Sequence, residues 1–332
     1  MYQDINWGKQ GDKRMIYLFD GHCDVLYKMW DLKNRTLFYQ NTDLLHSSFD
    51  RLLAGGVRVQ TMAVFVPPGV PKELRSYAAL QMIELLHHEI LQHPNVELIK
   101  SLEDLQSISI NPVEQKLYIL LSIEGADPLQ GDLTYLRIFY SLGVRSIGLT
   151  WNYRNEAADG VREKNPSGLS NFGYELIREM NRLKMSIDIS HLAEKGFWDC
   201  VENSEQPIMA SHCNSRALFD HPRNLSDEQV KAIYQMEGII GINFVPFFHS
   251  NEKEVQMKVI LNQIDYMLSL GGEDFLGFGS DFDGIDETIQ GLENSAQIAE
   301  LREECLKRYP EKIVKKLFFE NWRNYYQRLW ET

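Results

Sequence analysis

The chain has 332 residues, of which 44% are hydrophobic and 24% are charged, as in ordinary soluble globular proteins. The formal net charge of −13 disfavours a nucleic-acid binder, because a polyanion would be repelled. The sequence has no apolar run of about 18 residues, so no membrane span is expected. The polar segment 1–15 lacks the apolar core of a signal peptide, and the four cysteines form no CxxC pair. We therefore expect reduced thiols and a cytoplasmic enzyme.

Segments rich in apolar and β-branched residues alternate with amphipathic segments along the chain. Their patterns predict strands at 15–21, 57–66, 117–123, 145–150, 185–190, 207–211, 238–245 and 275–280. The helical spacing of apolar residues predicts helices at 74–91, 172–183, 226–236, 293–309 and 311–330. Ser226 and Gln229 have the spacing of a capping box, which would open the third of these helices.

Eight strands separated by helices predict an α/β fold, a single (β/α)8 TIM-like barrel. No linker rich in Pro, Gly or Ser divides the chain. We expect one catalytic domain over 1–332, with the C-terminal helices (about 293–332) packed on it. An open doubly wound sheet has the same alternation and is the alternative, but its ligand crevice would lie at one switch point rather than around a ring.

Ionisable side chains follow five of the predicted strands. The first strand runs into DGHCDVL (20–26), where His22 and Asp24 are two residues apart and would point to the same face. Four other strands end in residues of the same kinds: Glu124, His191, His212, and the pair Asp281 and Asp283. The carboxyl ends of barrel strands meet at one rim, where barrel enzymes carry their catalytic groups.

Each of these residues also has a purely structural interpretation. A single histidine such as His191 is more often a hydrogen-bonded structural side chain, Glu124 could begin a loop, and Asp281 or Asp283 could cap a helix. Three histidines and two carboxylates on one predicted rim favour a metal site, because structural residues would scatter over both rims. Five other histidines lack this context and are expected on the surface or in loops: His46, His87, His88, His93 and His249.

The predicted ligands also indicate the metal, and they are His22, Asp24, Glu124, His191 and His212. Imidazole nitrogens and carboxylate oxygens without a cysteine suit zinc, with manganese, cobalt or iron as substitutes. Five ligands exceed the three that a single catalytic zinc usually takes, so two zinc ions are expected. Glu124, with two oxygens, is the natural bridge. His22 and Asp24 would complete one site, and His191 and His212 the other.

With these residues in view, the chain resembles the membrane (renal) dipeptidase family, zinc metallopeptidases of the amidohydrolase superfamily. The matching motifs run in order along nearly the whole chain: DGHCDVL (20–26), IEGAD (123–127), YLRIFYSLGVRSIGLT (135–150), IDISH (187–191), SHCNSRAL (211–218), HPRNLSDE (221–228) and GFGSDFDG (277–284). The HxD motif alone is a weak signal, whereas the whole set in this order is specific.

The resemblance implies roles for individual residues. It implies a zinc pair held by the five ligands above, with Glu124 bridging and therefore catalytic. It assigns to Asp281 the proton transfer during attack and expulsion of the amine, with Asp283 next in line. Arg223 in HPRN matches the arginine that binds the terminal carboxylate of the substrate, a group that a guanidinium grips with two parallel hydrogen bonds.

One departure from the family pattern follows the fourth predicted strand. The renal enzymes carry a histidine there that contacts the reacting centre, whereas this chain has Trp151. Tryptophan offers only an N–H donor and cannot exchange a proton near neutral pH. Either the metal ions alone stabilise the oxyanion, or a neighbour such as Asn152 or Arg154 reaches the substrate. We list Trp151 and Asn152 among the expected substrate-binding residues.

Together these features predict a zinc-dependent metallo-dipeptidase that acts through a metal-bridging hydroxide, on substrates that include dipeptides with a D-residue at the carboxyl end. The alternative enzyme is another binuclear amidohydrolase that acts on an N-acyl amino acid, a lactone or a cyclic amide. A metal-binding sensor or scaffold without activity is a third interpretation. We expect a small dipeptide as partner, no nucleic acid and no membrane, and a homodimer by family habit.

Overall fold

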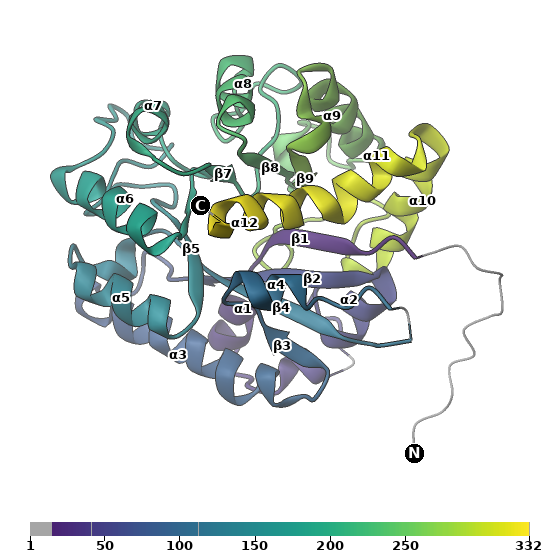
Figure 1. The fold of residues 1–332 in the computed structure, drawn as a ribbon, viewed down its shortest axis with the longest axis horizontal. Coiled ribbons are helices and arrows are strands. Elements are labelled where there is room, and N and C mark those ends of the chain that lie inside the picture. The colour runs from purple at the N-terminus through teal and green to yellow at the C-terminus, as the bar shows by residue number, and fades with distance from the viewer. Residues whose placement is uncertain (1–14, 41, 112, 332) are drawn as a thin grey trace.

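Eight parallel strands close into a barrel in the computed structural model, which describes residues 15–40, 42–111 and 113–331 (Figure 1). The ring runs β1–β2–β4–β5–β6–β7–β8–β9, and β9 pairs again with β1. The strands are β1 (Leu18–Cys23), β2 (Val57–Phe65), β4 (Leu117–Glu124), β5 (Val144–Gly148), β6 (Ser186–Asp188), β7 (Met209–Ala210), β8 (Ile239–Ile242) and β9 (Leu276–Phe278). The predicted (β/α)8 barrel is confirmed. The open doubly wound sheet is excluded, since the ring has no edge strand.

The eight ring strands are the eight strands predicted from the sequence, with bounds that differ by a few residues. A ninth strand, β3 (Val96–Leu98), was not predicted, because three residues are too few to show a period. It pairs with the first half of β4 outside the ring. The capping box at Ser226 and Gln229 is confirmed, with both of its hydrogen bonds present.

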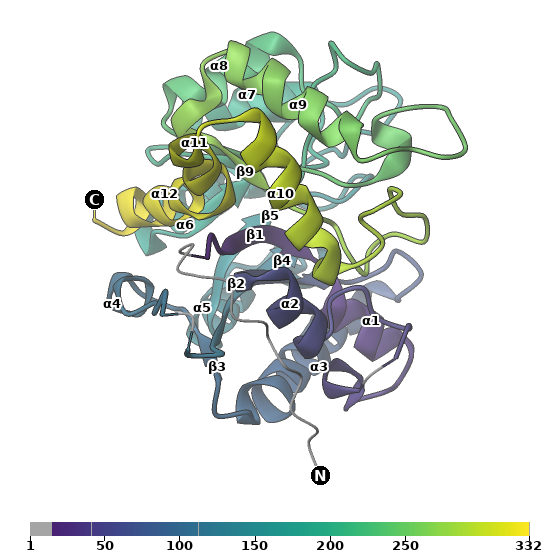
Figure 2. The ribbon, with the colours of Figure 1, turned by 90° about the vertical axis from the view of Figure 1, so that its right-hand side faces the viewer.

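Helices surround the barrel, with α7, α8 and α9 on one side of the strands and α1, α2 and α3 on the opposite side (Figure 2). Their bounds are α1 (Val25–Asp31), α2 (Phe49–Gly55), α3 (Arg75–His88), α4 (Leu102–Gln106), α5 (Leu133–Ser141), α6 (Asn171–Leu183), α7 (Glu194–Asn203), α8 (Asp227–Gln235), α9 (Lys258–Ser269), α10 (Ile298–Arg308), α11 (Glu311–Lys315) and α12 (Asn321–Glu331). The predicted helix 311–330 is one continuous helical stretch, in which a π-helical turn at Lys316–Glu320 joins α11 to α12. Among the described residues, no helix has the length and hydropathy needed to cross a bilayer.

The barrel buries one apolar layer inside the ring and another between the ring and the helices. Alternate residues of a strand face opposite sides. On β4, Leu117 and Ile119 pack in the outer layer with the helices, whereas Tyr118 and Leu120 pack inside the barrel. Glu124 has the same parity as Tyr118 and Leu120. Its carboxylate is therefore delivered to the inside of the barrel, at the carboxyl end of the strand.

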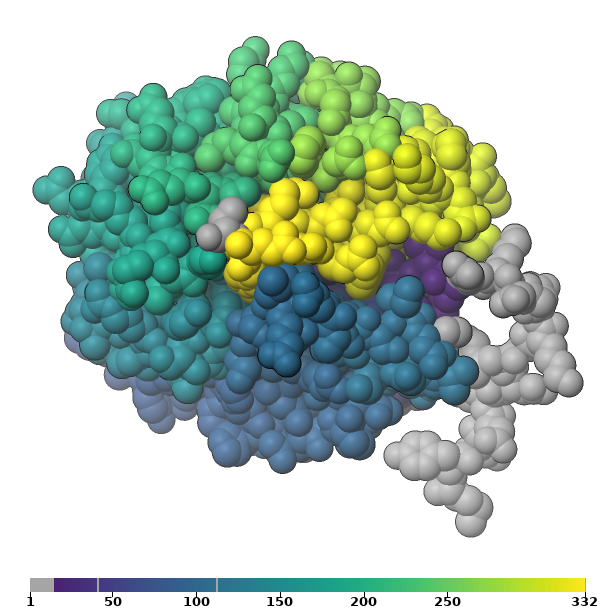
Figure 3. All heavy atoms as spheres, viewed as in Figure 1, coloured from purple at the N-terminus to yellow at the C-terminus, as the bar shows by residue number. Residues whose placement is uncertain are grey.

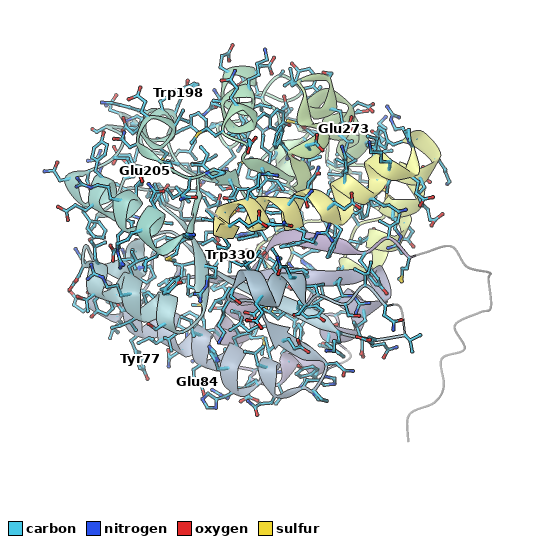
Figure 4. The ribbon with its side chains drawn as sticks, viewed as in Figure 1. Tyr77, Glu84, Trp198, Glu205, Glu273 and Trp330 are labelled. Carbon is cyan, nitrogen blue, oxygen red and sulfur yellow. The ribbon has the colours of Figure 1, made fainter. Side chains whose placement is uncertain are left out.

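The C-terminal helix α12 closes the amino end of the barrel. The ribbon and the space-filling view both show α12 lying across the centre of that face (Figures 1 and 3). Trp322 is buried inside the ring and donates its indole N–H to the carbonyl of Phe278 at 3.0 Å. Gly21 and Gly277 make room for this ring, since a Cβ atom on either would lie within 2.5 Å of it. At the other end of α12, Trp330 donates to the carbonyl of Lys184 at 3.1 Å (Figure 4). Trp322 and its aromatic neighbours thus fill the inside of the barrel at this end, whereas the predicted ligands follow the carboxyl ends of the strands.

Candidate metal centre and active site

The five predicted ligands come together at the carboxyl rim of the barrel. His22 is the last residue but one of β1, Asp24 follows that strand, Glu124 ends β4, and His191 and His212 follow β6 and β7. All five side chains are buried, with at most 9% of each residue exposed. Residues from four strands that are distant in sequence therefore share one interior spot, as the strand-end pattern predicts.

The two carboxylate oxygens of Glu124 face two different groups. Glu124 Oε1 lies 2.9 Å from His191 Nε2 and 3.6 Å from His212 Nε2, and those two nitrogens are 3.0 Å apart. Glu124 Oε2 lies 3.7 Å from His22 Nε2, which is 3.4 Å from Asp24 Oδ2. Glu124 thus stands between one pair of ligands and the other, which is the position that a bridging carboxylate needs.

The spacing and chemistry of these atoms fit divalent metal ions. Ligands bound tetrahedrally at 2.0–2.1 Å are separated by about 3.3 Å, close to the separations found here. Among the described residues, His22 Nε2 and Asp24 Oδ1 are buried without a hydrogen-bond partner. Orphaned buried polar atoms are costly in a folded protein. Two overlapping groups of three ligand atoms lie close enough to hold an ion, His22 with Glu124 and His212, and His22 with Asp24 and Asp281.

Burial and neighbouring charges shift the pKa values of the predicted ligands. Burial raises the pKa of Glu124 well above its usual range, and the neighbouring Asp24 raises it further. Burial alone would lower the pKa of His22, but Asp24, Glu124 and Asp281 outweigh it and raise that pKa to about 10. Burial, together with the positive charge of His22 and of Arg223, holds the pKa values of His191 and His212 well below normal. Those two imidazoles are therefore neutral, the form that binds metal.

Hydrogen bonds behind the ligands fix the orientation of two imidazoles. Asn152 Oδ1 lies 2.9 Å from His191 Nδ1, so Nδ1 carries the proton and Nε2 faces Glu124. Ser211 Oγ lies 2.7 Å from His212 Nδ1 and donates to the carboxylate of Asp188. Asp188 also accepts the backbone N–H groups of Ser190 and Ser211, both at 3.0 Å. The search for ionisable side chains at the ends of predicted strands indicated His191 and His212 as ligands, but it did not assign Asp188 a role in orienting them.

The two aspartates after β9 have different surroundings. Asp281 Oδ1 lies 3.9 Å from His22 Nε2, and burial raises the pKa of Asp281 to about 6 although His22 opposes the shift. Asp283 instead accepts the backbone N–H groups of His46 at 2.7 Å and Ser47 at 3.0 Å. Asp283 therefore anchors the 46–47 loop and does not face the ligands. Asp281 and Asp283 both have positive φ, at 64° and 69°, as does His191 at 66°. Such strained backbone clusters at functional sites.

Arg223 lies in the loop between β7 and α8 and is only 4% exposed. Its Nη2 donates to the carbonyl of His212 at 3.1 Å, and its Nη1 lies 3.6 Å from Cys213 Sγ. Its Nε has no partner among the described residues. Arg223 and His191 both line a cleft of about 430 Å³, whose walls also include Val161, Pro166, Leu192, Arg216 and Asp220. Because Arg223 lines this cleft beside the ligand His191, its guanidinium can bind an anionic end of a substrate.

The loop after β5 differs from expectation in two residues. Asn152 was expected to contact substrate, but it is 6% exposed and its amide oxygen is engaged with His191. Arg154 does not reach the site, because it forms a bidentate pair with Asp159. Trp151 lies at the rim, with its ring centre 6.1 Å from that of His191 and 5.1 Å from that of Phe65. Trp151 is therefore a close neighbour of the ligand His191.

Two of the histidines expected on the surface or in loops lie in loops, but they also contact residues near the site. His46 is in a loop, as predicted, but its Nδ1 accepts the N–H of Asp283 at 3.1 Å. His249 is 8% exposed and lies 2.8 Å from the carbonyl of Asn243. Asn243 follows β8 and donates to Asp281 at 2.9 Å. The same search at the ends of predicted strands would have found Asn243 if amide side chains had been included with the ionisable ones.

Comparisons with known proteins agree with this architecture. The family model described as membrane dipeptidase (peptidase family M19) matches residues 13–331. The dipeptidase tcpJ of Claviceps purpurea is 32% identical over 295 residues, which cover 83% of this chain and 68% of that one. A solved metallopeptidase described as dipeptidase AC of family M19 superposes with a TM-score of 0.88 at 30% identity, over 96% of this chain and 99% of that one. A Rhodobacter sphaeroides metallopeptidase, liganded with a phosphinate mimic of the dipeptide L-Ala-D-Ala, has a TM-score of 0.87 at 28% identity, over 95% and 99%.

Proposed function

This chain belongs to the membrane dipeptidase family, peptidase family M19, and is a metallo-dipeptidase, and from that premise we propose that its five buried ligands hold two zinc ions. His22 and Asp24 would hold one ion and His191 and His212 the other, with Glu124 shared between them. The observation that carries this proposal is the division of the two Glu124 oxygens, one 2.9 Å from His191 and the other 3.7 Å from His22. When bound, the ions lower the pKa of the attacking water and polarise the carbonyl of the scissile bond.

Asp281 is the proposed proton carrier. One of its oxygens points toward the ligands, 3.9 Å from His22 Nε2, and burial brings its pKa to about 6. A carboxylate with a pKa near the working pH can both take and return a proton, an effect that contributes roughly 10²–10⁴-fold to rate. Asp281 takes a proton from the attacking water, whose oxygen bonds to the carbonyl carbon. The C–N bond then breaks, and Asp281 returns the proton to the leaving amine.

Arg223 is proposed to bind the terminal carboxylate of the substrate. Arg223 lines the cleft beside His191, and its Nε has no hydrogen-bond partner among the residues that the structure describes. A carboxylate held there lies one residue behind the scissile bond, which restricts the enzyme to short substrates. We propose L–D as well as L–L dipeptides, with support from the L-Ala-D-Ala mimic bound by the Rhodobacter sphaeroides neighbour.

Metal analysis combined with a substrate panel tests these assignments. Zinc-loaded protein is assayed on L–L and L–D dipeptides beside N-acyl amino acids, lactones and cyclic amides. We expect about two zinc ions per chain and turnover of dipeptides only. Stronger turnover of an N-acyl amino acid, a lactone or a cyclic amide would replace the dipeptide substrate by one of those classes. Protein that binds no divalent ion would end the zinc proposal.

The cellular location and the oligomeric state are also proposals. A cytoplasmic location is proposed from the four cysteines, which are all buried free thiols. The homodimer stays a prediction that comes from the resemblance to the family.

A further inference from the structure

The backbone N–H, the backbone carbonyl and the side-chain amide of Asn243 all form hydrogen bonds. Its N–H donates to Asn214 Oδ1 at 3.1 Å. Its carbonyl accepts from Asn214 Nδ2 at 3.3 Å and lies 2.8 Å from His249 Nε2. These groups are buried, with Asn214 and Asn243 both fully inaccessible. The position of Asn243 is therefore fixed by the loops after β7 and β8 and not by the metal ligands.

The orientation of the Asn243 amide is also fixed. The backbone N–H of Val245 lies 2.5 Å from Asn243 Oδ1 and can only donate. The acceptor oxygen must therefore point to Val245, which leaves Nδ2 to donate to Asp281 Oδ2 at 2.9 Å. A flipped amide would place two donors against each other at Val245 and two acceptors against each other at Asp281.

This single donor divides the Asp281 carboxylate into two unlike oxygens. Asp281 Oδ2 receives the amide hydrogen bond, whereas Oδ1 is turned toward His22 at 3.9 Å. The main chain of Asp281 sits at a φ of 64°, and its N–H donates to the carbonyl of His22 at 3.1 Å. The backbone therefore fixes where the carboxyl group starts, and Asn243 fixes its rotation.

We propose that Asn243 is a positioning residue for the hydrolytic reaction, which holds Asp281 with Oδ1 free and aimed at the reacting centre. This inference rests on the proposed proton role of Asp281. An oxygen that already accepts a hydrogen bond is a poorer base, so proton transfer is directed through Oδ1. Without the amide, the carboxylate rotates and the share of molecules with a correctly placed oxygen falls.

Steady-state kinetics of zinc-loaded variants on one dipeptide test the proposal. Asn243→Ala removes the donor, and we expect kcat to fall roughly 10- to 100-fold with KM within about twofold of wild type, since misplacement of a catalytic group costs rates of this order. Asn243→Asp is the second variant, because it keeps the shape and the acceptor for Val245 while losing the donor. The same loss of kcat is expected, with unchanged zinc content.

A double variant separates positioning from a structural role. In the Asp281→Asn background, Asn243→Ala should change kcat less than about twofold, because the two residues act as a unit. The proposal would be overturned if the kcat losses of the two single variants multiplied in the double variant. It would also be overturned if Asn243→Ala changed only KM, or if Asn243→Asp kept wild-type kcat. If Asp281→Asn itself keeps wild-type turnover, the proton role moves elsewhere and the proposal on Asn243 fails with it, whereas dipeptidase activity stands.

Asn321 offers a matched control. It is another buried asparagine, and its Nδ2 donates to the carbonyls of Glu273 and Leu276 at 2.9 and 2.8 Å. Glu273 lies beside the C-terminal helical stretch (Figure 4), and Leu276 begins β9, the strand that Asp281 follows. Asn321→Ala should lower the unfolding midpoint without lowering kcat. If it lowers kcat as much as Asn243→Ala, the loss reflects general loosening of the barrel and the proposal is wrong.

Discussion

The amide oxygen of Asn152 lies 2.9 Å from Nδ1 of His191, so a residue expected to touch substrate instead orients a ligand. Loss of such a partner typically weakens metal binding 10- to 100-fold. We predict that Asn152→Ala weakens zinc binding by about this factor, as measured by competition with a chelator. Tyr153→Ala is the control, because Tyr153 is 49% exposed and should leave affinity unchanged. Equal affinities of Asn152→Ala and wild type would contradict the orienting role.

Gly284 is required by its distance from two carboxylates. A Cβ atom at this position would lie 2.2 Å from Asp24 Oδ2 and 2.8 Å from Asp281 Oδ1, closer than real contacts allow. We predict that Gly284→Ala lowers kcat/KM on a dipeptide about 100-fold, because both groups must move. Gly69→Ala meets no atom within 4 Å and should behave as wild type. A fully active Gly284→Ala enzyme would show that neither carboxylate needs its present position.

The two aspartates after β9 should respond differently to the same substitution. Asp281→Asn should keep its metal ions while kcat falls at least about 100-fold, because the amide cannot accept a proton. Asp283→Asn should instead lower the free energy of unfolding by about 1–3 kcal/mol, since one backbone N–H of the 46–47 loop then faces an amide donor. Denaturant unfolding and turnover, measured on both variants, check this contrast. The reverse outcome would give the proton role to Asp283.

Arg223 should matter only for substrates that end in a carboxylate. We predict that Arg223→Lys lowers kcat/KM for a dipeptide about 10- to 100-fold, because lysine cannot donate two parallel hydrogen bonds from a planar group. The same change should hardly affect the slow hydrolysis of a C-terminally amidated dipeptide. Equal losses on both substrates would mean that Arg223 supports the cleft wall and does not bind the carboxylate.

Metal uptake should release protons. In the metal-free protein the pKa of His22 is about 10, above its ordinary value of 6.5, because Asp24, Glu124 and Asp281 outweigh burial. Protonated His22 therefore stabilises the metal-free fold fully below pH 6.5, and this contribution is lost as pH rises through 10. At pH 8 a metal ion must displace that proton, and we predict that zinc binding releases at least about one proton. Calorimetry in buffers of different ionisation enthalpy measures it, and no release at pH 8 would contradict the shift.

The rim could be predicted because a parallel barrel sends every strand end to the same place. His22, Glu124 and His212 needed only a strand assignment to be brought together, even though β7 has just two residues. Asn152 could not be placed in this way, because its direction depends on the long loop after β5. The division of the Glu124 oxygens is likewise set by side-chain packing that no residue spacing encodes.

The tryptophan that fills the amino end of the barrel has a consequence for biosynthesis. Trp322 packs inside a ring that begins at Leu18, so the first strand cannot reach its final packing until α12 has been made. A nascent chain that ends before Asn321 would carry an open ring with Phe19, Tyr118 and Ile239 exposed to solvent, a target for chaperones and proteases. The barrel therefore completes its packing only after synthesis has passed α12.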